Sequence, residues 1–130
     1  MYLEALRVAR QLRAHAECMP YPALTAEVGR LAAEADRHVA DLAGELRRLA
    51  GDADRDVAAT PRAGRNAWER LTADLADLQS LHRRYTELAL RYDVDFPDTA
   101  TSLDRLARET ARMERRIRTL TSRADPHAEN

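Results

Sequence analysis

The feature that most constrains the fold of this chain is a segment that occurs twice, 75 residues apart. YPALTAEVGRLAAEADRH at residues 21–38 aligns without gaps with FPDTATSLDRLARETARM at residues 96–113. The alignment pairs six identical residues: Pro22/Pro97, Arg30/Arg105, Leu31/Leu106, Ala32/Ala107, Glu34/Glu109 and Arg37/Arg112. Because each copy starts with a proline and continues with apolar residues at helical spacing, the repeat predicts one helical hairpin followed by another.

Apolar residues recur three and four positions apart along four stretches, and this spacing predicts four amphipathic helices. Pro20 and Pro22 separate the first two, and Gly51 is the expected C-terminal cap of the second. Thr101, with Asp98 as a rival, is the expected N-cap of the fourth. We expect an all-α four-helix bundle in one domain, with helices at about residues 2–18, 23–50, 64–92 and 99–123 and a flexible tail at 124–130.

The stretch GDADRDVAATPR, residues 51–62, breaks the helical spacing and is predicted to be a long middle connection between the hairpins. Fully extended, it reaches roughly 40 Å, and a helix of the length predicted for residues 23–50 is about 42 Å long. The connection is therefore long enough to cross over the bundle and make the second and third helices parallel. A compact loop giving a simple up-down bundle remains the alternative.

Composition excludes several classes of function. The 21 basic residues, all of them arginine, are balanced by 22 acidic residues. With no basic excess, we expect no nucleic-acid partner, even for the arginine-rich fourth helix. Cys18 is the only cysteine, so neither an internal disulfide nor a cysteine metal cluster is predicted. No apolar run approaches 18 residues, so we expect no membrane association and a cytoplasmic location.

Histidine and glutamate side chains at one predicted height are the candidates for chemistry. His38 is expected level with Glu4 of the first helix, and His82 level with Glu109 of the fourth. If the middle connection crosses over, the candidate metal ligands converge at mid-bundle: Glu34, His38, His82, Glu109 and, as a further possibility, Glu4. Imidazole and carboxylate donors suit iron, manganese or zinc. In the simpler alternative no cofactor is held: Glu34 pairs with Arg37 or His38, Glu109 pairs with Arg105 or Arg112, and His82 packs beside Tyr85.

The paired hairpins, the repeat, the long connection and the glutamate-to-histidine spacing resemble the ferritin-like superfamily. PALTAEVGRLAAEADRHVADLAGELRRLAG, residues 22–51, is most similar to the second helix of rubrerythrin-like domains and of small bacterial stress-associated ferritin-like domains. The resemblance implies a ferritin-like fold. In metal-active members, two helices each contribute Glu-x-x-His and the other two each contribute a Glu.

This sequence departs from that ligand pattern. Glu34 and His38 are four residues apart instead of three, and the repeat places Met113 where a second His38 would stand. Asp74 and Asp77 are predicted to lie off the buried face of the third helix. We therefore expect a non-catalytic bundle with a degenerate metal site, acting through self-association or a protein partner. The alternative is a two-ion iron or manganese protein with iron oxidation or storage activity.

Overall fold

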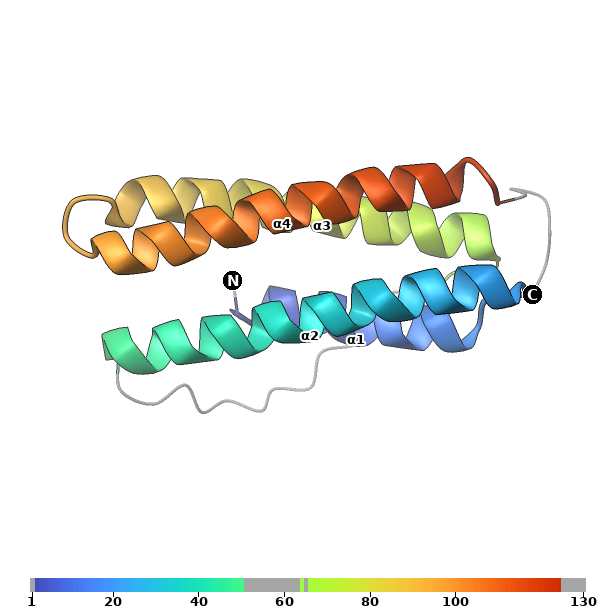
Figure 1. Cartoon of the computed structure of the whole chain (residues 1–130), viewed down its shortest axis with the longest axis horizontal. Helices are drawn as coiled ribbons and strands as arrows, with labels where there is room; N and C mark the ends of the chain where they lie inside the picture. The colour runs from blue at the N-terminus through green and yellow to red at the C-terminus, as the bar shows by residue number, and fades with distance from the viewer. Residues whose placement is uncertain (1, 51–63, 65, 125–130) are drawn as a thin grey trace.

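Figure 1 shows four helices arranged as two antiparallel pairs in the computed structural model. The structure describes residues 2–50, 64 and 66–124, and the side chains of all of these except 46–50. The helices are α1 (Tyr2–Glu17), α2 (Pro22–Ala50), α3 (Ala67–Tyr92) and α4 (Pro97–Thr121). The prediction of an all-α four-helix bundle built from two hairpins is confirmed.

The two hairpins are joined so that α2 and α3 run in the same direction. In Figure 1 both begin at the end of the bundle where α4 finishes, and both end where α4 begins. α1 packs against α2 and α3, and α4 packs against α3 and α2, whereas in the described residues no Cα atoms of α1 and α4, or of α2 and α3, lie within 8 Å of each other. The end of α2 and the start of α3 therefore lie at opposite ends of the bundle, which is the arrangement that the crossover alternative predicts. The whole of the predicted connection at 51–62, with the predicted cap Gly51, lies outside the described residues, as does the predicted tail after residue 124.

Two helices start two or three residues away from the predicted positions. α3 begins at Ala67 instead of residue 64, because the side chain of Asn66 accepts a hydrogen bond from the backbone N–H of Glu69 at 2.9 Å and acts as the N-cap. α4 begins at Pro97, a residue suited to the first helical turn, and no side-chain hydrogen bond caps it. Thr101 is already inside that helix and bonds back to a main-chain carbonyl.

Apolar side chains from all four helices fill the core. The largest fully buried side chains include Leu12, Leu42, Leu71, Leu78, Tyr85, Leu103, Leu106, Met113, Ile117 and Leu120. On α3 the buried face differs from the prediction, since Asp74 and Asp77 are buried whereas the His82 side chain is 38% exposed. None of the described helices is long and apolar enough to cross a membrane.

Hydrogen bonds and ion pairs join one hairpin to the other along their length. Between α1 and α3 they include Arg7–Asp77, Gln11–Asp74, His15–Asp74 and Glu4–Ser80. Between α2 and α4 they include Glu27–Arg116, His38–Glu109, Asp41–Arg105 and Glu45–Thr99. Because each set pairs rising residue numbers on one helix with falling numbers on the other, it fixes the register of the hairpins and places the middle of α2 opposite the middle of α4.

Candidate functional site

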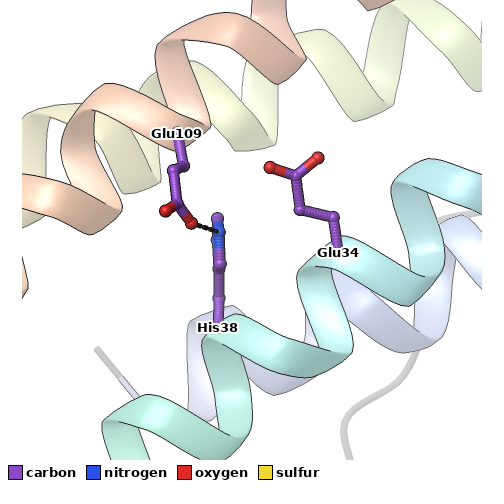
Figure 2. Close-up of side chains that lie close together, drawn as sticks. All are labelled: Glu34, His38 and Glu109. Atoms are coloured by element: carbon purple, nitrogen blue, oxygen red, sulfur yellow. Dashed lines mark hydrogen bonds and ion pairs between the residues drawn. The ribbon is translucent and has the colours of Figure 1, made fainter.

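Glu34, His38 and Glu109 meet between α2 and α4. Glu34 and His38 are one helical turn apart, so both side chains leave the same face of α2. Glu109 reaches toward them from α4, and Figure 2 shows the three side chains pointing toward one another. One donor atom from each residue lies within 4.8 Å of the other two. Three of the five predicted ligands are therefore brought together.

His38 is bonded directly to Glu109. The distance from His38 Nε2 to Glu109 Oε1 is 3.0 Å. Burial lowers the pKa of His38 below its usual value, although the hydrogen bond to Glu109 and its negative charge oppose the shift. Burial alone would raise the pKa of Glu109, but hydrogen bonds from His38 and Arg105 outweigh it and lower that pKa. An ionised carboxylate can only accept a hydrogen bond, so near neutral pH the lowered pKa values correspond to a neutral imidazole that donates its Nε2 proton to Glu109.

Arginine side chains surround this group on its open side. Arg105 lies 3.3 Å from Glu109 Oε2 and 3.2 Å from Asp41 Oδ2. The groove above the group has a volume of about 350 Å³ and is lined by Glu34, Arg37, Ala40, Asp41, Arg105, Glu109 and Arg112. Three carboxylates face three guanidinium groups there, so the formal charge of the groove is zero. Neutral surroundings weaken the attraction for a cation relative to an acidic cluster.

Glu4 and His82, the other two predicted ligands, lie outside this group. Glu4 accepts a hydrogen bond from Ser80 at 2.8 Å and lies 3.4 Å from Arg84 Nε, so its carboxylate is held on the α1–α3 side. His82 Nδ1 lies 3.3 Å from Glu114 Oε1 within the α3–α4 hairpin. The predicted heights bring these residues to mid-bundle, but their positions around the helix axes direct them to other partners.

The internal repeat accounts for the way the site is built. Glu34 and Glu109 are partners in the repeat, and they approach each other across two antiparallel helices. Equivalent residues of two copies meet in this way when the copies are related by a twofold axis passing between them. The repeat partner of His38 is Met113, which is buried in the apolar core. Only one copy therefore supplies an imidazole.

A second polar group, between α1 and α3, was missed by the sequence analysis. Gln11 Nε2 donates to Asp74 Oδ1 and Asp77 Oδ2, both at 2.8 Å. His15 Nδ1 lies 3.0 Å from Asp74 Oδ2, and Arg7 pairs with Asp77 at 3.0 Å. The Gln11 and Asp74 side chains are completely buried. A buried carboxylate needs such partners because its charge is costly to remove from water.

The donor chemistry of Glu34, His38 and Glu109 fits one divalent transition-metal ion. One imidazole nitrogen and two carboxylate oxygens are ligands that zinc, iron and manganese accept. To bind an ion through Nε2, His38 must first give up the proton it donates to Glu109. Metal binding would therefore replace the existing hydrogen bond, and it would also compete with Arg105 for Glu109.

Comparisons of the chain with protein-family models, with curated proteins and with solved structures found no match.

Proposed function

We propose that this protein is a non-catalytic, ferritin-like bundle in which ion pairs occupy the position of a metal centre, and that it acts through association with itself or with a protein partner. The crossover order of its helices supports the ferritin-like part of the proposal, because one long crossover is the topology of that bundle class. The repeat-related pair Glu34 and Glu109 supports it further.

One observation supports the proposal that the protein is non-catalytic. The three metal-ligating side chains that meet between α2 and α4 are half of the number that a two-ion centre needs. A two-ion carboxylate centre in this class of bundle uses four glutamates and two histidines. Among the described residues only Glu34, His38 and Glu109 form a group that could hold an ion. Glu109 is also bonded to Arg105, so its carboxylate is already neutralised without a metal. In this proposal Glu34, His38 and Glu109 have a structural role and hold α2 against α4.

The proposal places the protein in the cytoplasm, with no nucleic-acid partner. Arginines of α4 are committed to acidic neighbours: Arg105 to Asp41, Arg108 to Asp104 and Arg116 to Glu27. Such paired charges attract a phosphate backbone only weakly, since binding to nucleic acid depends on an excess of free basic groups.

A second candidate function follows from the 4.8 Å convergence of the three donor atoms. In this second function the protein is an iron or manganese carboxylate protein that binds one ion instead of two. Such an ion would link α2 to α4 in place of the His38–Glu109 hydrogen bond. A protein with one ion would not act as a two-ion oxidase, because a single iron cannot form the carboxylate-bridged pair that such oxidation chemistry uses.

Iron loading in air separates these functions. The purified chain is mixed with two or more equivalents of ferrous iron, and bound iron per chain and the rate of ferric iron formation are both measured. We expect no more than one bound ion per chain and oxidation no faster than in buffer. Two bound ions per chain, with saturable oxidation, would overturn the proposal in favour of the two-ion alternative.

Matched variants locate any ion that does bind. Glu34→Gln removes one donor charge at the site with little change in side-chain volume. Glu87→Gln is the control, because Glu87 is exposed on α3, away from the group. Metal content that falls in the first variant and not in the second assigns the ion to the α2–α4 site. Equal metal content in both variants would show that the ion binds elsewhere, and the second candidate function would be lost.

A further inference from the structure

One end of the bundle carries an exposed apolar surface. The turn between α3 and α4 presents Leu90, Val94 and Phe96, whose exposed fractions are 75%, 86% and 46%. Phe96 is held by an edge-to-face contact with Tyr92, with ring centroids 5.8 Å apart. Large apolar side chains gathered at one exposed turn are typical of a surface that contacts another protein.

Acidic residues alternate with these apolar ones. The sequence of the turn is DVDFPD, and Asp93, Asp95 and Asp98 are all exposed. None of the three forms an ion pair with another residue in the described part of the chain, and Arg91 is the nearby basic residue on α3. We call Leu90, Asp93, Val94, Asp95, Phe96 and Asp98 the acidic tip. With Arg91 included, its formal charge is −2.

The opposite end of the bundle holds an apolar hollow with a basic rim. It lies between the first turns of α2 and the end of α4, with a volume of about 350 Å³. Leu24 and Leu120 form its apolar lining, while Tyr21, Arg30 and Arg123 stand around it. We call these five residues, together with Glu27, the basic hollow. Figure 1 shows the turn between α3 and α4 at one end of the molecule and the start of α2 beside the end of α4 at the other.

Arg123 gives this hollow its uncompensated charge. Glu27, the one acidic residue among the described residues that line it, is paired with both Arg30 and Arg116. The Arg123 side chain is exposed and pairs with no other residue in the part of the chain that the structure describes. Among the described residues that line the hollow, Arg30 and Arg123 are set against Glu27, which gives a formal charge of +1. The described side chains of the acidic tip and of the basic hollow therefore carry opposite formal charge beside apolar residues.

We propose that the acidic tip of one copy docks into the basic hollow of a second copy, so that the protein associates head to tail. This inference rests on the association part of the proposed function. The hollow is large enough for one or two aliphatic side chains such as Val94, and the aspartates beside it would face Arg123 and Arg30. Because the two surfaces lie at opposite ends, the contact joins unlike surfaces and leaves one of each free, which produces open chains instead of closed dimers.

The contact is expected to be weak and dependent on salt. A single turn entering one hollow buries less surface than the roughly 1,200 Å² that stable interfaces exceed. The paired charges are at the surface. Raising the ionic strength from about 0.1 M to about 1 M therefore shortens the screening length of their attraction from about 10 Å to about 3 Å. Association should therefore increase steadily with protein concentration and decrease as salt is added.

Sedimentation and light scattering of the full chain test the inference. At low salt we expect the average mass to exceed the 14.7 kDa of one chain and to pass twice that value as the concentration approaches about 1 mM, the range of weak contacts. Val94→Asn and Arg123→Glu, both at exposed positions, should each weaken association by about tenfold. Arg83→Glu makes the same charge change on the exposed middle of α3 and should leave association unaltered.

Mixing the two variants distinguishes head-to-tail docking from any other self-association. The Val94→Asn variant keeps its hollow and the Arg123→Glu variant keeps its tip, so an equimolar mixture should form dimers and nothing longer. A wild-type chain that stays monomeric at low salt overturns the inference, as does association that stops at a dimer. A mixture no more associated than its components also overturns it. None of these results alters the outcome of the iron-loading test, so the non-catalytic part of the proposed function is tested separately from head-to-tail docking.

Discussion

Replacing the small side chain of Asp74 should strongly lower the stability of the folded protein. Its side chain is completely buried and accepts hydrogen bonds from Gln11 Nε2 at 2.8 Å and from His15 Nδ1 at 3.0 Å. Each hydrogen bond to a charged group contributes about 1.5–3 kcal/mol. Removing the buried carboxylate relieves its desolvation, but it leaves polar groups of α1 facing the core. We therefore expect Asp74→Ala to lower the free energy of unfolding by about 3–5 kcal/mol.

Urea denaturation followed by circular dichroism measures this loss. The control is Asp104→Ala, which breaks the exposed pair with Arg108 and should cost less than about 1 kcal/mol. Replacing Gln11, His15 and Asp74 together by leucine should recover most of the loss, since a buried polar group exchanged for apolar residues is often neutral. An Asp74→Ala variant no less stable than the Asp104→Ala control would refute the reasoning that this network joins the hairpins.

Three further effects are expected at separate positions. Burial lowers the pKa of His38, so just below about pH 6.5 the folded state binds fewer protons than the unfolded state. The free energy of unfolding should therefore fall on acidification from there, by at most about 1.4 kcal/mol per pH unit. The His38→Gln variant, which keeps an N–H donor for Glu109, should show a flatter dependence in urea titrations at several pH values; an unchanged slope would contradict this assignment. Asn66→Ala should cost about 1 kcal/mol of stability by removing the N-cap of α3, and an unaltered urea midpoint would argue against the cap. Tyr85→Phe should leave the thermal midpoint unchanged or raise it, because the buried Tyr85 hydroxyl has no hydrogen-bond partner among the described residues; a large decrease would reveal one.

The helices and part of the candidate site follow from local patterns. The three-four spacing of apolar residues gives the four helices to within a few residues, and Pro97 gives the start of α4 once its preference for the first turn is applied. Glu34 and His38 share a face because they are one turn apart. The repeat then identifies Glu109 as the residue that faces Glu34. The helices, the shared face of Glu34 and His38, and the position of Glu109 can therefore be predicted from helix geometry and the internal alignment alone.

The remaining polar contacts depend on long-range packing that spacing does not specify. On α3, Leu71, Asp74, Leu78 and Leu81 also follow three-four spacing, but an aspartate is normally taken to mark the exposed face. Its burial depends on Gln11 and His15, which lie 63 and 59 residues away. His82 lies outside the group of Glu34, His38 and Glu109 for the same reason, because the packing of α3 places it beside Glu114.

Electron paramagnetic resonance of the chain with manganese most directly tests the claim that this bundle retains only half of a two-ion centre. Two equivalents of Mn²⁺ are added to the purified protein, and the low-temperature spectrum is recorded. The account predicts the signal of isolated ions alone, either free in solution or held singly by Glu34, His38 and Glu109. A multiline spectrum from two coupled manganese ions, lost in Glu34→Gln, would contradict it.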